Sequence, residues 1–554
     1  MPYQPFLITF GTGKFIGLEP WLSPQDGFPT LENMFVNKRV LQKRLGFSPF
    51  ATMKHGAVVQ STTSITGIKT YLSKGFPHLL IIDTTRANLY NAVDGSMTDI
   101  SSDLSIPADI FSGGASNFIH FLNWQNVFTE PSVAYMTNNV DQVHKWAGPS
   151  NAVVPFNIKI SSDTKDNHVD TCRFLFVIDD RLVLLDTVEF GDHHPQRLRF
   201  GPVLGTDLSA PGSGSDDAET QEVISAAGMI GKTVYAFFEG PDGGSLWRIR
   251  RTGNTDIPLE WERITNTEGS RSPYSGVKFK DGLAAIGLSN ILFTDGSLIQ
   301  PIRNLDTPSV RDILTEFNDT KIRSVFGHNQ KQIDQRHLLW TFANSGSSSM
   351  DRLLDMNVNE GNFTKHKSEQ SFFLNCLGSF NGQKVPSWVE LDDVIGDDGD
   401  LVSDMDVDSR AVLGDPQPFT LIGCRNSQVY KWNHGEFDGT DNDNGKIAIK
   451  GLSARLNPFL KQGRKAMLEK VEIYLTNDSN ASFTVALFKN TSTSAYKTKV
   501  ISADLSNDKD FVTIFADGEI GKFHRLQISH TERNNTPRIH AFIFYFKPAG
   551  RLAA

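Results

Sequence analysis

Cysteine, long apolar runs and helical periodicity are all scarce in this chain of 554 residues. The three cysteines, Cys172, Cys376 and Cys424, lie far apart among apolar residues, which excludes a disulfide framework and the CxxC spacing of metal or redox motifs. We therefore expect reduced thiols in the core. No run reaches the ~18 apolar residues of a membrane helix, and the first ten residues lack the basic start of a signal peptide. We expect a chain made in a reducing compartment, without a membrane span or Sec-type export.

Amphipathic helices are nearly missing, and the best helical pattern is a short one at 310–317. Short runs rich in β-branched and aromatic residues, with 39 Phe in the whole chain, are instead separated by Gly, Asn, Asp and Pro. This pattern predicts an all-β fold.

The strand-like runs recur in groups of about four, one group every 35–55 residues or so, which is the period expected of β-propeller blades. No rigid signature such as a repeated Trp-Asp dipeptide accompanies them. Some groups show three runs, among them the last one at 372–378, 419–424 and 428–432. The rhythm predicts a β-propeller of about seven blades, with six or eight possible.

Domain borders follow from changes in this rhythm. We expect 1–60 to lead into the propeller and the propeller itself to span 61–450. Acidic stretches near 207–222 and 391–409 interrupt the rhythm and are expected to be solvent-facing insertions. From 451 the runs become longer, and some are apolar on both faces, so 451–554 is predicted to be a C-terminal β-sandwich.

Charge is distributed unevenly between these regions. The whole chain has a net charge of −9, which does not suit a general nucleic-acid binder with a basic stripe. From Gly451 onward there are 15 Lys and Arg against 9 Asp and Glu, whereas the preceding residues have 39 against 54. A mildly basic C-terminal module therefore follows an acidic body.

Motifs for phosphate or metal binding are weak. The stretch 11–17 (GTGKFIG) fits neither GxGxxG nor GKS/GKT, so a β-turn is the better interpretation. His193 and His194 are adjacent in a Gly-Asp-His-His-Pro segment and are interpreted as surface turn residues; His120 and His144 show no ligand spacing. The aspartates of 438–445 form half of a calcium-loop pattern without its closing Glu, which favours a solvated turn.

Catalytic motifs are equally scarce. No GxSxG elbow occurs, and the Asp-Gly-Ser turns at 94–96 and 295–297 lack the rest of a sialidase repeat. A propeller can hold a pair of glycosidase carboxylates on its axis, and the sequence leaves that possibility open. The sequence offers no catalytic, cofactor-binding or metal-binding residues, and we expect neither an enzyme nor a cofactor.

One N-terminal segment, 31–47 (LENMFVNKRVLQKRLGF), resembles a signature of phage tail proteins in which an early strand pair precedes a propeller. The pattern predicts that its basic residues lie on the exposed side of the strand pair. The residues that match are Asn33, Leu41, Lys43, Arg44, Gly46 and Phe47.

Three later segments, 136–146, 176–200 and 544–551, are similar to strand pairs and a closing strand of the same group. Two positions depart from its pattern, because Asn139 stands for a usual Gly and Ala147 for a usual Asp. The chain thus resembles the tail nozzle or tail hub (tail tubular protein B-like) family of short-tailed bacteriophages.

This resemblance implies a structural protein of the virion tail, synthesised in the host cytoplasm. It would form a homo-hexameric ring that contacts adaptor and portal-proximal proteins and holds tail fibres or spikes. Genome DNA would pass through the lumen without sequence-specific binding, and an acidic wall would keep the duplex from adhering. Two other classes stay open: a glycan- or receptor-binding module, and a glycosidase-type propeller enzyme.

Overall fold

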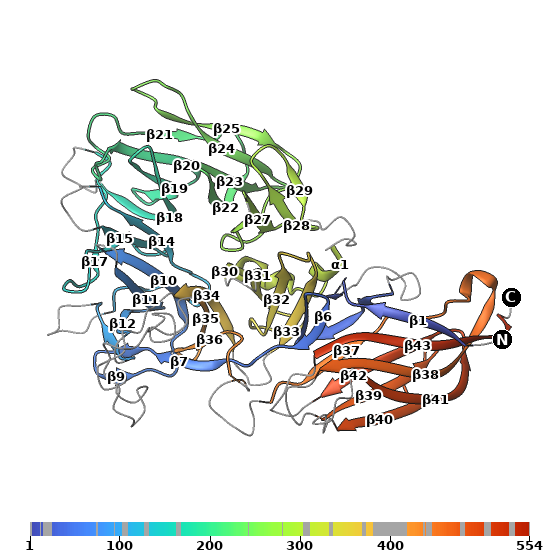
Figure 1. Ribbon diagram of the computed structural model, residues 1–554. Helices are drawn as coiled ribbons and strands as arrows, with labels where there is room; N and C mark the ends of the chain where they lie inside the picture. The colour runs from blue at the N-terminus through green and yellow to red at the C-terminus, as the bar shows by residue number, and fades with distance from the viewer. Residues whose placement is uncertain are drawn as a thin grey trace, which may run out of the picture.

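A computed structural model of the chain describes residues 3–11, 13–14, 25–73, 76–92, 95–101, 109–126, 132–161, 168–241, 243–279, 281–302, 311–331, 336–367, 373–380, 418–435, 438, 446–476, 482–502, 511–530 and 538–552. Within these ranges the chain is almost entirely β-strand (Figure 1). The helical segments there are short: α1 (Arg311–Leu314), η1 (Asp319–Ser324) and η3 (Leu460–Gln462). None of the described helices is long and apolar enough to cross a membrane.

In the described ranges, seven antiparallel four-stranded units form a ring, which confirms an all-β propeller and agrees with the expected number of about seven blades (Figure 1). Blades one to three consist of β10 (Ile65–Ser73), β11 (Phe76–Asp83), β12 (Ala87–Tyr90) and β13 (Met97–Asp99); β14 (His120–Trp124), β15 (Val133–Thr137), β16 (His144–Trp146) and β17 (Val154–Pro155); and β18 (Val169–Ile178), β19 (Arg181–Glu189), β20 (Asp192–Val203) and β21 (Gly214–Asp217).

Blades four to six follow in chain order. They consist of β22 (Val223–Ile230), β23 (Thr233–Glu239), β24 (Ser245–Arg251) and β25 (Leu259–Thr265); β26 (Val277–Phe279), β27 (Gly282–Ile286), β28 (Ile291–Thr294) and β29 (Ile299–Pro301); and β30 (Phe326–Lys331), β31 (Arg336–Phe342), β32 (Arg352–Asn357) and β33 (Phe363–Lys367).

The seventh blade takes strands from both ends of the propeller. β34 (Leu374–Phe380), β35 (Phe419–Cys424) and β36 (Gln428–Lys431) are joined by β7 (Ser48–Thr52), which pairs antiparallel with β36. A hairpin of β8 (Lys54–His55) and β9 (Val58–Val59) follows before blade one begins. An N-terminal strand therefore closes the ring, which explains why the last group of runs in the sequence is one strand short.

The sandwich is built from the C-terminal region together with the N-terminus. One sheet contains β41 (Phe511–Gly521), β38 (Arg464–Thr476), β43 (Arg538–Arg551), β6 (Val40–Lys43) and β5 (Met34–Asn37), and β1 (Gln4–Thr9) also pairs with β43. The other contains β4 (Thr30–Glu32), β37 (Ile449–Leu452), β42 (His524–His530), β39 (Ser482–Lys489) and β40 (Lys497–Ser502). The segment 1–60, which was expected to lead into the propeller, thus also supplies strands to both sheets of the sandwich.

The two domains share a sheet. β33, the last strand of blade six, pairs with β4, so blade six continues into one sheet of the sandwich. The short strands β2 (Gly13–Lys14) and β3 (Gly27–Phe28) pair with each other, and β2 also pairs with β33. In Figure 1 the sandwich accordingly lies against the side of the ring near blade six, with both chain termini at its far end.

The acidic stretch 207–222 is not simply an insertion, because it contains β21, the outermost strand of blade three. Neighbouring groups satisfy its carboxylates: Asp217 pairs with Arg197 at 2.7 Å, and Asp216 accepts the Trp261 N–H at 2.6 Å. The stretch 391–409 lies outside the described residues. The helical pattern at 310–317 coincides with α1, and all three cysteines are free and buried, as expected.

Candidate functional site

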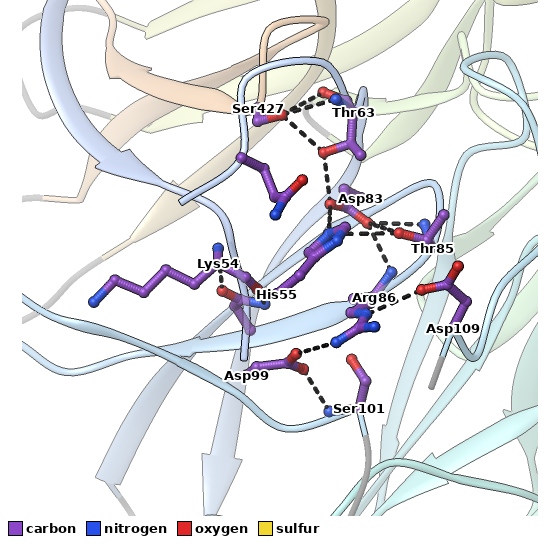
Figure 2. Close-up of polar contacts among 12 residues, drawn as sticks. Lys54, His55, Thr63, Asp83, Thr85, Arg86, Asp99, Ser101, Asp109 and Ser427 are labelled. Carbon is purple, nitrogen blue, oxygen red and sulfur yellow. Dashed lines mark hydrogen bonds and ion pairs between the residues drawn. The ribbon is translucent and has the colours of Figure 1, made fainter. Parts of the chain in front are cut away.

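Polar side chains gather where the propeller ring closes, around the fully buried carboxylate of Asp83 at the end of β11 (Figure 2). One oxygen accepts the backbone N–H groups of Thr85 and Arg86 at 2.8 and 2.7 Å. The other accepts the Thr63 hydroxyl at 2.7 Å and lies 2.7 Å from Nε2 of His55. The carboxylate thus connects blade one to the β8–β9 hairpin that follows the closing strand.

A second set of contacts holds the same hairpin from the other side (Figure 2). The Arg86 guanidinium lies between Asp99 and Asp109, at 2.9 and 3.0 Å. Asp99 also accepts the backbone N–H groups of Gly56 and Ser101, at 2.8 and 2.9 Å. Burial by itself would raise the pKa of Asp99, but these N–H donors and Arg86 outweigh it and lower the pKa.

Ser427 connects blade seven to these contacts. Together, His55, Thr63, Asp83, Arg86, Asp99 and Ser427 form what we call the closure network. Ser427 lies in the turn between β35 and β36 with φ 63°, and its hydroxyl is 2.8 Å from the Thr63 hydroxyl. Its backbone carbonyl accepts the Met53 N–H, and its backbone N–H donates to the Thr63 carbonyl. His55 contacts the carboxylate rather than Ser427, so the residues do not form a nucleophile–base–orienter relay. The network is suited to holding the ring closed.

The propeller axis is crossed by aromatic rings. Phe118 packs against Tyr274 and Phe326 with centroid distances of 5.1 and 5.0 Å, and Phe174 packs against Tyr274 at 6.3 Å. Phe174 and Phe326 belong to blades three and six, Phe118 directly precedes blade two, and Tyr274 precedes blade five. The inner strands β10, β14 and β34 contact their neighbours around the ring. Aromatic side chains from different sides of the ring therefore meet at this level.

Two basic side chains lie on the inner strands beside these rings. Burial lowers the pKa of Lys69 and, together with the nearby Lys69 charge, lowers that of His120 to about 3. His120 Nδ1 accepts the Leu175 N–H at 3.2 Å, so the neutral ring carries its proton on Nε2. Across the described part of the inner strands, the one carboxylate is Asp170, which accepts the Gly191 N–H. These strands do not supply the carboxylate pair of a glycosidase.

Arg44 lies at the joint between the sandwich and the propeller and is fully buried. Its guanidinium makes two hydrogen bonds of 2.7 Å to Asp438, one of 3.0 Å to the Asn33 side chain, and others to the Leu45 and Lys367 carbonyls. All five guanidinium N–H donors are thereby used. Because Lys367 ends blade six and Arg44 follows β6, this side chain joins the two domains.

Aromatic rings enclose the same guanidinium. Its central carbon lies 4.5 Å from the Phe47 ring centroid and 5.7 Å from that of Trp432, and the two rings are 5.1 Å apart. Phe47 precedes the closing strand β7, and Trp432 follows β36 of blade seven. The strand pair expected at 31–47 is confirmed as the β5–β6 hairpin, but the expected exposure is wrong for Lys43 and Arg44, which are buried.

A buried carboxylate lies beside this joint in blade six. Asp355 on β32 is 2.5 Å from Nδ1 of His337 and 3.0 Å from Nε2 of His366. Burial alone would raise the pKa of Asp355, but the two imidazoles outweigh it and hold the pKa well below its usual range. Burial lowers the pKa of His366, whose ring lies 5.1 Å from Trp432. These groups fix the face of blade six that meets the sandwich.

The candidate metal residues are not brought together. Asp438 is buried against Arg44 rather than solvated, which corrects the expectation for the 438–445 loop; 439–445 lie outside the described residues. His193 lies on β20 and contacts Asp186 at 2.6 Å, so it is a strand residue rather than a turn residue. His120 and His144 belong to blade two. In the described ranges no group of three or more His, Cys, Asp or Glu could hold a metal ion.

The phosphate-loop candidate at 11–17 contains β2, and 12 and 15–17 lie outside the described residues. The expected β-turn is thus partly replaced by a short parallel strand. The closure network and the Arg44 joint could not be seen in the local sequence, because each depends on a contact between residues hundreds of positions apart, Thr63–Ser427 in the first and Arg44–Asp438 in the second. The resemblance at 31–47 was the one signal that pointed to Arg44.

The fold and the joint define a seven-bladed β-propeller protein with an attached β-sandwich. No family model matches the chain, and no curated protein matches it. Among solved structures it is similar to an exo-β-1,3-galactanase from Phanerochaete chrysosporium bound to galactose, with 9% identity and a TM-score of 0.25 over 80% of this chain and 98% of that one. A variant of that enzyme bound to β-1,3-galactotriose gives the same identity and TM-score over 91% and 100%.

A third similar structure is YCF48 bound to a D1 peptide, with 9% identity and a TM-score of 0.36 over 71% of this chain and 98% of that one. At these TM-scores and identities, the similarities carry no argument about substrate or partner.

Proposed function

We propose that the protein is a structural component of the virion tail of a short-tailed bacteriophage, a nozzle or hub ring of identical subunits. The proposal starts from the tail-protein signature at 31–47. Its support is the place of that signature in the fold: Asn33, Arg44 and Phe47 all belong to the buried joint between sandwich and propeller. A signature at such a joint encodes an architecture rather than a reaction.

The path of DNA in such a ring follows from the packing of the single subunit. Aromatic side chains cross the axis of the propeller, so duplex DNA would pass between subunits and not through a blade ring. The residues before Gly451 carry the acidic excess. Carboxylates facing the lumen would repel phosphates and keep the duplex mobile.

The partners expected of this role are adaptor and portal-proximal proteins on one side and fibres or spikes on the outside. The chain would be synthesised in the host cytoplasm and act without a cofactor or catalytic step. The mildly basic sandwich offers a surface for an acidic neighbour in the tail.

Cryo-electron microscopy of particles of the phage that encodes the chain tests the proposal directly. The expected result is a ring of copies around the tail axis, with six as the expected number and an acidic lumen wide enough for duplex DNA. Peptide mass spectrometry of the same particles should find the chain at a constant ratio to the portal protein. Absence from purified virions would refute the tail assignment.

A second candidate function is glycan or receptor binding by the sandwich. It is favoured by aromatic side chains on the outward face of β41, where Phe511 and Phe515 are 45% and 59% exposed. Phe511 also stacks on Tyr474 at 5.5 Å, which forms a flat platform of the kind that binds apolar ring faces. A glycan array read with the wild type and with Phe515→Ser separates this function from the first, since a purely structural subunit binds no glycan.

A further inference from the structure

A cavity of about 360 Å³ opens between blades five and six, a size within the range of small-ligand sites. Leu288, Leu314, Phe317 and Ile322 supply its apolar lining, and Ser289, Thr315, Asp319 and Arg271 supply the polar part, with Arg271 as the cationic group. Leu288, in the turn between β27 and β28, keeps 58% of its surface exposed. We call this site the blade five–six pocket.

The wall that carries Arg271 is held by buried hydroxyl groups. Ser270 and Ser275 both bond the Ile286 backbone, through its carbonyl at 3.1 Å and its N–H at 3.1 Å. Ser272 donates to the Val325 carbonyl at 2.7 Å, which ties this wall to blade six. The backbone N–H of Arg271 donates to the Ile286 carbonyl at 2.8 Å. The guanidinium is therefore presented from a fixed backbone.

The opposite wall is equally fixed. Asn318 caps η1 by accepting the Thr320 N–H at 3.0 Å, and its amide donates to the Ser347 carbonyl at 2.7 Å. The Phe317 ring stacks on Phe342 with a centroid distance of 4.1 Å and an interplanar angle of 7°. Pre-organised walls reduce the entropy lost when a ligand binds.

Most guanidinium N–H groups of Arg271 make no hydrogen bond within the described part of the chain. Its recorded side-chain contact in the described part of the chain is a single bond of 3.2 Å from Nη1 to Asp319, whose side chain is 79% exposed. An exposed ion pair of this kind is weak and is readily replaced by another carboxylate. The remaining guanidinium N–H groups can bind an anion in the two-point geometry that suits carboxylates.

We propose that the blade five–six pocket binds an anionic apolar group, with a large apolar ring among Leu288, Phe317 and Ile322 and an adjoining carboxylate on Arg271. The ligand carboxylate displaces Asp319, which stays in solvent. The apolar walls supply affinity, and the single cation selects acids over neutral analogues. This inference does not depend on the tail assignment.

Two probes that differ only in charge test the pocket on the full chain: N-acetyltryptophan, a carboxylate, and N-acetyltryptophanamide, its neutral analogue. Equilibrium dialysis should show the acid binding about tenfold more tightly than the amide, because a charge-assisted hydrogen bond is gained. Arg271→Met should abolish this preference while leaving amide binding unchanged. Leu288→Asp should weaken both probes, since it places a charge at the apolar mouth.

Arg323→Met is the matched control, because Arg323 lies on η1, the 3₁₀ helix that also carries the pocket residues Asp319 and Ile322, but is 63% exposed and pairs with Glu239 outside the pocket. It should retain both affinities and the preference for the acid. Equal binding of acid and amide by the wild type would overturn the proposal, as would a preference that survives Arg271→Met. Lack of binding by both probes at millimolar concentration would overturn it as well.

The chemistry can come from a free acid or from a peptide segment with a large apolar residue beside an acidic one. An acetylated, amidated hexapeptide with an internal Trp-Asp pair separates these sources in the same dialysis. Tighter binding of the hexapeptide than of N-acetyltryptophan assigns the pocket to a protein partner. Weaker binding of the hexapeptide assigns it to a small acid.

Discussion

At the scale of single residues, the Arg44–Asp438 pair is the contact whose loss should cost most. Both side chains are fully buried, and the guanidinium also satisfies the Asn33 side chain and two backbone carbonyls. Arg44→Met leaves Asp438 as an uncompensated buried charge, which costs about 3–5 kcal/mol. Urea unfolding followed by intrinsic fluorescence measures this loss.

The control for that experiment is Arg251→Met. Arg251 pairs with Asp179 at 2.6 Å, but the two side chains are 50% and 44% exposed. Solvent screens such a pair, so the urea midpoint should stay close to that of the wild type. Equal effects of the two substitutions would mean that the buried joint adds nothing beyond a surface ion pair.

Buried histidines make stability depend on pH. Burial and Lys69 lower the pKa of His120 to about 3, whereas an unfolded histidine titrates near 6.5. As pH falls below about 6.5, His120 becomes protonated in the unfolded chain but stays neutral in the folded chain. The free energy of unfolding is therefore highest above that pH and decreases below it. The His120 contribution to the loss is about 2 kcal/mol at pH 5.

Unfolding by urea at pH 8 and pH 5 tests this dependence. The His120→Gln variant keeps an acceptor for the Leu175 N–H. Between pH 8 and pH 5 its free energy of unfolding should decrease by about 2 kcal/mol less than that of the wild type. His540→Gln, at an exposed position on β43, should lose as much as the wild type. A His120 variant with the full wild-type pH dependence would contradict the assignment.

At the scale of elements, ring closure depends on the contacts around Asp83. Asp83→Asn replaces an acceptor-only group by one with a misplaced N–H₂ donor, against two backbone N–H groups and two hydroxyl groups. The expected cost is about 1–3 kcal/mol. Hydrogen exchange should become faster in the β8–β9 hairpin and in β7, while blades three to five keep their protection.

The control for the closure prediction is Asp295→Asn. Asp295 lies in the exposed turn before β29 and bonds the N–H and hydroxyl of Ser297, at 2.9 and 2.6 Å. The faster hydrogen exchange caused by Asp295→Asn should be confined to blade five. Unchanged exchange in β7 after Asp83→Asn would show that strand pairing with β36 alone keeps the ring closed.

The elements that the sequence predicts well are those defined by local signals. The β18–β19 hairpin turns at Asp179 and Asp180, both with positive φ. Asn139 also has a positive φ of 60°, at a position where the family that the chain resembles usually has Gly. Short β-branched runs between such turns identify strands without any knowledge of their partners. The number of blades followed from counting these runs.

The pairing partners of several strands could not be predicted in the same way, because the paired strands lie hundreds of residues apart in the sequence. Ala51 pairs with Val429, and Gln4 pairs with Phe546. An alternating pattern shows that a strand has a buried face but does not say against which sheet. For the same reason, the burial of Arg44 and the pocket around Arg271 are not visible in the local sequence.

At the scale of the whole molecule, the sandwich should not fold from its C-terminal residues alone. Seven of the 27 buried residues in its core precede the propeller: Ile8, Phe10, Phe28, Leu31, Met34, Val36 and Leu41. The same N-terminal segment supplies β1, β4, β5 and β6 to its two sheets. A fragment of 451–554 would expose the face that these strands cover, and it also lacks part of β37.

Expression of 451–554 by itself should therefore give a chain with narrow amide dispersion in its ¹H–¹⁵N correlation spectrum and no cooperative thermal transition. A fusion of 1–43 to 446–554 through a Gly/Ser linker restores the core residues and the pairing of β1 and β6 with β43. It should show dispersed signals and a cooperative transition. A cooperatively folded 451–554 fragment would mean that β38, β41 and β43 close their own core, with the N-terminal strands merely added to it.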